Sequence, residues 1–370
     1  MNAESDIEII KGNILLFFCY EVAYSIRMEK LEAMLTQQET AGTISLQRSK
    51  SHYPRFENMP LLVKQGNAPV TLGEREVSVA VQARVFDFGV VSLCFKIPYS
   101  GNFPALVRES ALLSRLDTFF ELSRNYLRRI EEIIAPALNN PIESSLVEDY
   151  FIFQVAELSR PLTGEELLKK YGREIAMILR AEEQSLSDQE IQRALAHDIS
   201  YYPEDILVID WDRAFLYDKE ENTDHIDIIE FANTQLLDMR YFDGWLDREL
   251  DRLYLELKAE RFAPPFWRVA RFRRLSKRVM LLMTDVMFLT DQIDNSLRAT
   301  DTLYAARVHK AIGQKLYLEE WKAGLNKKLL ALRDISNNLN MQIYNLRSMI
   351  LELSIVVLIV VEIVLGLVRH

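Results

Sequence analysis

The sequence predicts an α+β fold, in which an N-terminal mixed α/β region is followed by long antiparallel or coiled-coil helices and a C-terminal helix of transmembrane type. Strand-like and helix-like stretches alternate as far as Asp227, after which strand signals stop. The chain then ends in a run, Leu353 to Val368, that is apolar except for Ser354, Glu362 and Gly366. Glycine is scarce, with 12 in 370 residues, which favours helix in the second half.

The net charge and the cysteine content indicate which compartment and which class of partner to expect. A net charge of -10 argues against wrapping nucleic acid with the whole surface, although it allows a local basic patch. Cys19 and Cys94 lie in apolar stretches and are predicted to be buried free thiols in a reducing compartment, with a disulfide left open. Residues 1–12 are acidic where a secretory signal needs positive charge. We therefore expect the bulk of the chain in the cytoplasm.

Residues 1–136 are predicted to form a first α+β region. β-branched and aromatic residues indicate strands, and apolar residues at helical spacing indicate helices. Prolines at 54, 60 and 69 suggest an irregular arm. In chain order we expect a strand over 13–24, a short helix over 27–35, the irregular arm over 37–75, two strands within 77–97 and one long amphipathic helix over 103–134.

Residues 137–227 are predicted to form a second region with the order β-α-β-α-β-β. Thr163 is expected to cap its first helix, and the Ser187-x-x-Glu190 capping box is expected to open its second. The strands are expected over 149–158, 173–181, 206–210 and 213–218. This order suggests a small mixed sheet covered by helices.

Residues 228–348 are predicted to be long helices, with a break at Pro264-Pro265. Leucine recurs there every seventh residue, at Leu318, Leu325, Leu332, Leu339, Leu346 and Leu353. This seam is about 54 Å long as a helix and must be buried against a partner helix. The partner is either the preceding helix of the same chain or another subunit, and the sequence leaves both open.

Residues 349–370 are predicted to be a membrane anchor. Leu353 to Val368 would span about 24 Å as a helix, against a hydrocarbon core of about 30 Å, and Arg369 could reach headgroups. Glu362 would cost a few kcal/mol if ionised at mid-bilayer. That cost falls if the acid is protonated, packs among helices or lies near the far interface.

A basic segment, 268–278, contrasts with the acidic chain. It contains Arg268, Arg271, Arg273, Arg274, Lys277 and Arg278 without an acid, beside Phe266, Trp267 and Phe272. Such a segment suits anionic lipid headgroups, RNA or a ribosomal surface. Alternatively, its arginines pair with the acidic helix over 247–260 or face water.

Catalytic and metal-binding patterns are missing from the sequence. It contains no G-x-G-x-x-G, G-x-x-x-x-G-K-[ST], H-E-x-x-H or G-x-S-x-G motif, and no Cys-His pair with metal spacing. His197 and His225 have aspartate neighbours, which we interpret as surface polar groups. We predict no enzyme activity, no cofactor and no small-molecule substrate.

Several segments resemble the "required for meiotic nuclear division" family, in particular its larger bacterial-type members. The final LELSIVVLIVVEIVLGL resembles the closing segment of that family, which typically carries a glutamate in a hydrophobic stretch. Trp321 to Leu332 resembles its pre-anchor helix, 231–247 another family segment, and 86–91 its early Phe-x-x-Gly strand. The resemblance implies a membrane-associated, self-associating protein; the mitochondrial members support organellar translation as scaffolds at the inner membrane. It supplies no catalytic residues.

The prediction is therefore a membrane-anchored scaffold that forms a homo-oligomer through its heptad leucines and tail, with the bilayer as partner. Glu362 would help to specify the packing of tails. One alternative is an RNA- or ribosome-associated factor that uses the segment 268–278. Another is an ion-conducting oligomer resembling CorA-type magnesium channels, which need two spans and a Gly-Met-Asn loop where this sequence offers one span.

Overall fold

The computed structural model of the chain describes residues 7–40, 45–48, 60–219, 223–259, 265–297 and 303–368. The chain divides into two compact units. Unit 1 comprises Met1–Tyr241 and Asn295–Glu319, and unit 2 comprises Phe242–Asp294 and Glu320–His370. A mixed α/β region with a sheet precedes the helices and the long apolar C-terminal helix, so the predicted fold class is confirmed.

Unit 1 is built on a nine-stranded sheet with the strand order β3-β4-β5-β6-β1-β8-β11-β10-β9. All neighbouring strands are antiparallel except β8 and β11, which are parallel. A separate two-stranded sheet pairs β2 with β7. The strands are β1 (Glu8–Glu21), β2 (Ala23–Ile26), β3 (Ser45–Arg48), β4 (Leu61–Leu72), β5 (Arg75–Val85), β6 (Val90–Asn102), β7 (Leu138–Pro141), β8 (Val147–Leu158), β9 (Asp198–Ile199), β10 (Ile206–Ile209) and β11 (Arg213–Tyr217).

Helices alternate with strands as far as β11, and only helices follow it among the described residues. They are α1 (Met28–Thr40), α2 (Phe103–Arg115), α3 (Thr118–Ile134), the short 3-10 helix η1 (Ala135–Ala137), α4 (Gly164–Arg180), α5 (Asp188–Ala194), α6 (Asp224–Ala259), α7 (Pro265–Leu297), α8 (Leu303–Lys315) and α9 (Leu318–Val368).

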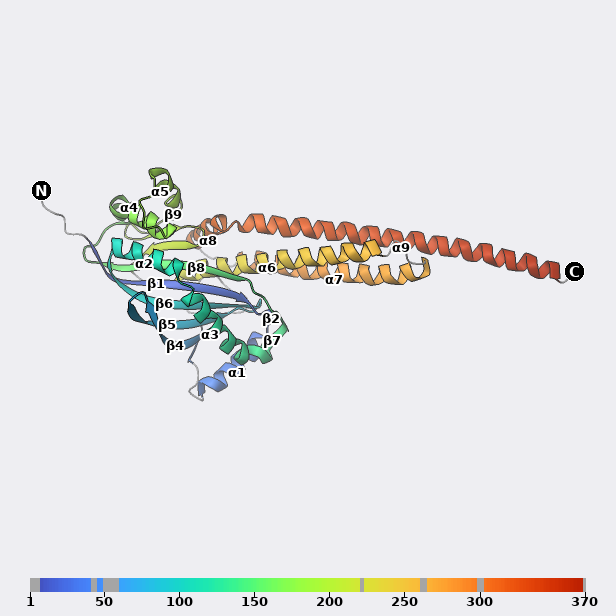
Figure 1. Cartoon of the computed structure of the whole chain (residues 1–370), viewed down its shortest axis with the longest axis horizontal. Helices are drawn as coiled ribbons and strands as arrows, with labels where there is room; N and C mark the ends of the chain where they lie inside the picture. The colour runs from blue at the N-terminus through green and yellow to red at the C-terminus, as the bar shows by residue number, and fades with distance from the viewer. Residues whose placement is uncertain are drawn as a thin grey trace. The chain divides into compact units, whose positions relative to one another are not determined.

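The main core of unit 1 lies between one face of the sheet and the helices α2, α3 and α4. Figure 1 shows α2 and α3 lying over the strands. In the central strand β1, Leu16 is opposite Phe95 of β6 and Phe151 of β8. Alternate residues point to opposite faces, so this register sends one set of large side chains into the core. A smaller cluster that includes Cys19 and Phe231 covers part of the other face, where the first half of α6 packs.

Three local predictions are wrong, and the first concerns residues 173–181, which we expected to form a strand. They continue α4, which begins at the predicted cap Thr163, and the structure adds a capping box between Thr163 and Glu166. Leu167, Ile175 and Leu179 are fully buried at helical spacing. The cap at Thr163 starts the helix, and the apolar residues at helical spacing continue it through 173–180 in spite of the β-branched residues there.

The expected irregular arm, 37–75, contains β4. Buried residues alternate at odd positions before Gly66 and at even positions after it. A bulge at Gly66, whose φ is +80°, shifts the register between the two parts. Pro69 is tolerated because, among the described residues, β3 pairs with residues 61–64 of β4 and leaves the stretch around Pro69 at the edge of the sheet. The expected helix over 103–134 is two helices, because Leu116 adopts an extended conformation that ends α2.

Candidate functional site

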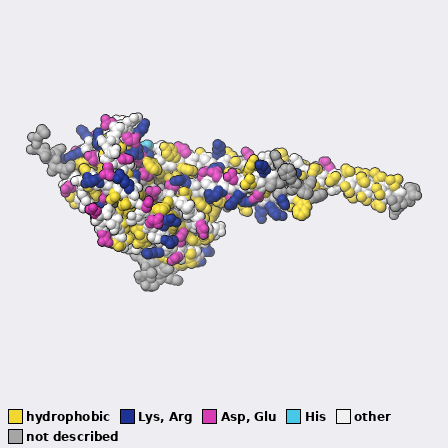
Figure 2. Space-filling view, in the orientation of Figure 1, with side chains coloured by type: hydrophobic (Ala, Val, Ile, Leu, Met, Phe, Trp, Pro, Cys, Tyr) yellow, Lys and Arg dark blue, Asp and Glu magenta, His cyan; other side chains and the backbone are white. Residues whose placement is uncertain are grey.

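The end of α9 exposes apolar side chains on every side. From Leu351 to Leu367, each large apolar side chain is between 47% and 75% exposed. Figure 2 shows this length as a nearly continuous hydrophobic surface. A helix that is apolar all round is normally buried in a core or in a membrane. Among the described residues, α9 is the one helix long and apolar enough to cross a bilayer, by length and composition.

Glu362 is the acid between Leu353 and Leu367, and its side chain is exposed in the chain. The nearest acid before it is Glu352, which accepts a hydrogen bond from the Ser348 hydroxyl at 3.3 Å. Arg369, predicted to reach headgroups at the far end, lies outside the described residues. The exposed length therefore carries one ionisable group, Glu362, between Leu353 and Leu367.

The heptad leucines are mostly buried inside the chain. In unit 2 the exposed fractions are 4% for Leu325, 0% for Leu332, 1% for Leu339 and 8% for Leu346. Leu318 is buried in unit 1, whereas Leu353 is 56% exposed. The seam of unit 2 packs on the chain's own helices, since Lys328 bonds the carboxylates of Asp243 and Asp247 on α6. Of the two partners left open by the sequence, the geometry supports the intramolecular one.

The basic segment 268–278 lies in α7 and divides between two faces. Arg278 pairs with Glu249 at 2.5 Å and with Glu256 at 2.7 Å, both on α6. Arg268 lies over the ring of Phe272, which is itself buried. The remaining basic side chains, Arg271, Arg273, Arg274 and Lys277, are exposed. The tertiary structure thus uses Arg278 for pairing with α6, whereas the side chains of these four residues lie at the surface of unit 2.

A groove of about 640 Å³ lies between three helices of unit 2. Arg268 and Phe272 of α7 line one side, Tyr254 of α6 a second side, and Leu346 and Met349 of α9 a third. The groove therefore joins the basic segment to the part of α9 that immediately precedes the exposed apolar length.

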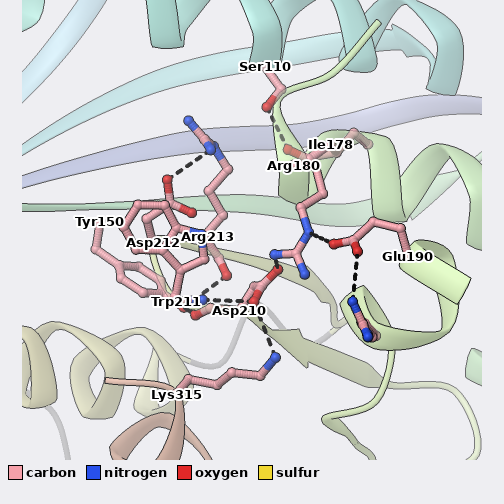
Figure 3. Close-up of polar contacts among 11 residues, drawn as sticks. Ser110, Tyr150, Ile178, Arg180, Glu190, Asp210, Trp211, Asp212, Arg213 and Lys315 are labelled. Atoms are coloured by element: carbon pink, nitrogen blue, oxygen red, sulfur yellow. Dashed lines mark hydrogen bonds and ion pairs between the residues drawn. The ribbon is translucent and has the colours of Figure 1, made fainter. Parts of the chain in front are cut away.

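In unit 1 a cluster of charged side chains surrounds Asp210, at the end of β10 (Figure 3). Asp210 is buried, and its carboxylate accepts hydrogen bonds from Arg180 of α4, from the Trp211 amide at 3.0 Å and from Lys315 of α8 at 3.2 Å. Arg180 also donates to Glu190 of α5 at 2.7 Å. These bonds attach the β10–β11 hairpin to three helices, which is a structural role.

The same hairpin is attached to β8 by Tyr150. The Tyr150 hydroxyl lies 2.8 Å from the carbonyl oxygen of Asp210 and 2.9 Å from that of Arg213. Burial raises the pKa of Asp212 to about 6, opposed by its partner Arg213. The sequence did not reveal this cluster, because its members are single charges on separate elements that only the fold brings together. The available signal was Asp210, the aspartate that ends the apolar stretch ILVID.

The first half of α6 presents buried polar groups to the second face of the sheet. Arg84 of β5 pairs with Asp227 at 2.7 Å and with Glu230. Burial lowers the pKa of Arg84, but Glu230 and Asp227 raise it more, so the guanidinium stays charged. Burial raises the pKa of the thiol of Cys19 and that of Cys94, and both cysteines are free, as predicted.

Two carboxyl groups, Glu21 of β1 and Asp238 of α6, are buried together on this face. Both oxygens of Glu21 and one oxygen of Asp238 have no hydrogen-bond partner among the residues that the structure describes. Burial raises the pKa of both, and the charge of Asp238 raises that of Glu21 further. At least one of the two is therefore held as the neutral acid, because an unpaired buried carboxylate is costly.

His225 was interpreted as a surface group, and this is wrong. It is buried, and its Nε2 lies 2.8 Å from the Tyr304 hydroxyl, while His309 Nε2 lies 3.0 Å from Gln235 Oε1. Burial lowers the pKa of His225 and lowers that of His309 to about 4, so both rings are neutral near pH 7. Within the part of the chain that the structure describes, no cluster of His, Cys, Asp or Glu could hold a metal ion.

Together, these features define a class: an α+β domain joined to a helical unit whose last helix is a candidate membrane anchor. Residues 11–224 match the family described as "Uncharacterized protein MJ0711, N-terminal domain", and the chain belongs to that family because the match covers more than half of it. The protein described as "Uncharacterized protein MJ0711" from Methanocaldococcus jannaschii is 26% identical over 224 residues, which is 60% of this chain and 67% of that protein. No solved structure matches the chain.

Proposed function

We propose that this protein is a membrane-anchored scaffold without a catalytic step, held in the bilayer by the end of α9. The observation that carries the proposal is the exposed apolar length from Leu351 to Leu367. Burying such surface in lipid stabilises the inserted state by roughly 25 cal/mol per Å². Arginine and histidine at the C-terminus, Arg369 and His370, provide a polar end to the span.

The bulk of the chain is proposed to lie on the cytoplasmic side. Two free cysteines, Cys19 and Cys94, suit a reducing compartment. This feature favours a protein whose last helix enters the membrane from the side of synthesis.

Self-association is proposed to use the tail. The leucines from Leu325 to Leu346 already pack within the chain, so the exposed surface begins with Leu353. An ionisable side chain such as Glu362 costs a few kcal/mol against lipid, and packing of tails against one another would reduce this cost. Glu362→Leu is expected to reduce the particle size of the protein in mild detergent. An unchanged size would place Glu362 at an interface with headgroups and remove it from this role.

Membrane extraction tests the anchor with matched substitutions on one helix. The test variant carries Val357→Arg and Val360→Arg, within the exposed length. The control carries Met341→Arg and Tyr344→Arg, which replace exposed side chains of α9 before that length. We expect the wild type and the control to stay with the membrane in alkaline carbonate and the test variant to be released. A wild-type protein that is fully released would overturn the proposal.

An RNA- or ribosome-associated function is the second candidate, favoured by the four exposed basic side chains of α7. It predicts salt-sensitive RNA binding that weakens when Arg271, Arg273 and Arg274 are replaced by alanine. An ion-conducting oligomer predicts flux through reconstituted vesicles that depends on Glu362. The membrane-anchored scaffold differs from both, because it requires neither RNA binding nor flux.

A further inference from the structure

The first turns of α7 lie at the level where the exposed apolar length of α9 begins. The Ser276 hydroxyl lies 3.0 Å from Asn340 Oδ1, while Arg268 and Phe272, earlier in α7, share a groove with Leu346 and Met349, later in α9. The two helices are therefore antiparallel here. Counting from this hydrogen bond at 1.5 Å per residue, Pro265 lies level with about residue 351 of α9.

This level sets the distance of each basic side chain from the membrane. If the hydrocarbon begins near Leu351, Arg271 lies about 9 Å outside it along the helix axis and Arg274 about 14 Å. The headgroup layer is roughly 5–7 Å thick on each side, and electrostatic attraction extends about 8 Å further at physiological salt. Flexible arginine side chains shorten these distances.

The orientation of the segment keeps its charges available. Phe272, Leu275 and Val279 are buried on one face of α7, and Arg273, Arg274 and Lys277 are exposed on the opposite face. Residues 265–284 themselves contain no acid. Trp267 is 69% exposed near the start of the helix, at the level where tryptophan is typical of a membrane interface.

We propose that the exposed basic face of α7, formed by Arg271, Arg273, Arg274 and Lys277, binds the anionic phospholipid headgroups of the membrane that holds α9. The inference rests on the proposed anchor and adds a lipid preference to it. The level of the segment favours this ligand over RNA, because a bilayer around α9 brings phosphate groups next to these residues without a further partner.

The test uses the full chain in vesicles of phosphatidylcholine mixed with phosphatidylglycerol. After mild detergent extraction, native mass spectrometry counts how many lipids of each kind stay bound. We expect phosphatidylglycerol to be enriched on the wild type and the enrichment to fall at least about fivefold in Arg271→Gln/Arg273→Gln/Arg274→Gln. One basic residue next to an anionic surface supplies about that factor.

Two controls separate charge from fold and from distance. Arg271→Lys/Arg273→Lys/Arg274→Lys keeps the charge and should keep the enrichment. Arg307→Gln/Lys327→Gln/Arg333→Gln removes three exposed charges of α8 and of α9 before Asn340, and it should also keep the enrichment. If the wild type inserted into the vesicles but bound both lipids equally, this inference alone would be overturned. That would hold whether or not the segment bound RNA. A wild type that alkaline carbonate releases from the membrane would overturn the anchor and the inference together.

Discussion

Ser276 Oγ and Asn340 Oδ1, 64 residues apart in the chain, lie 3.0 Å apart and join α7 to α9. This contact brings a basic segment beside the beginning of the apolar length, although about 70 residues separate the two along the chain. The basic segment and the beginning of the apolar length therefore lie near one level of unit 2. The predictions below test the contacts that produce this arrangement and those that hold unit 1.

Leu332→Ala is expected to reduce the free energy of unfolding of unit 2 by about 2–5 kcal/mol, because Leu332 is fully buried and the substitution leaves a cavity. Chemical denaturation of the detergent-solubilised chain measures the loss. The loss should not depend on protein concentration, since the leucine packs inside the chain. Leu353→Ala, at an exposed position of the same seam, is the control and should change stability little. A loss that grows on dilution would indicate packing between subunits.

Arg278→Gln is expected to destabilise unit 2 by about 1–2 kcal/mol, because it leaves the buried carboxylate of Glu249 with Arg252 as its remaining ion-pair partner. Thermal unfolding measures the difference. Arg274→Gln removes the same charge from the exposed face and should stay within about 0.5 kcal/mol of the wild type. Equal effects of the two substitutions would contradict the separate roles of the two faces.

Glu21 and Asp238 are expected to make unit 1 less stable as pH rises. Burial raises the pKa of both carboxyl groups, with mutual repulsion adding for Glu21, so the unfolded chain loses their protons at lower pH than the folded chain. Their stabilising effect is complete below about pH 4 and is lost as pH rises through the raised folded-state pKa, by at most about 1.4 kcal/mol per pH unit for one proton. Unfolding free energies measured across this range should fall less in Glu21→Gln. The exposed control, Glu165→Gln, should follow the wild type.

Gly89→Ala is expected to prevent unit 1 from folding normally. Gly89 has a φ of +96°, and an added Cβ would lie 1.8 Å from the carbonyl oxygen of Ala23. Backbone strain alone costs about 1–3 kcal/mol, and the clash adds to it. Gly66→Ala is the control, since Gly66 has a φ of +80° with open space around its Cβ and should cost only about 1–2 kcal/mol. Similar melting temperatures for the two variants would show that the contact at Ala23 relaxes.

Local signals in the sequence predicted much of unit 1 and the end of the chain. The capping sequence at Thr163 determines where α4 begins, because its partner Glu166 is three residues away. The free cysteines and the apolar length of α9 were also predicted from composition alone. By contrast, the length of α4 and the strand β4 were mispredicted, because a β-branched stretch and a proline each allow more than one structure until neighbouring elements pack on them.

The sequence by itself therefore determined the α+β class, the helical second half and the exposed apolar end, since each depends on composition and on spacing within one element. Only the tertiary structure decided that the leucines from Leu325 to Leu346 pack inside the chain, that Arg278 pairs while Arg274 faces solvent, and that α7 starts where the apolar length begins. These outcomes depend on contacts between residues far apart in the chain. Spacing along one helix identifies the face that must be buried, but the partner that buries it is chosen by packing between elements.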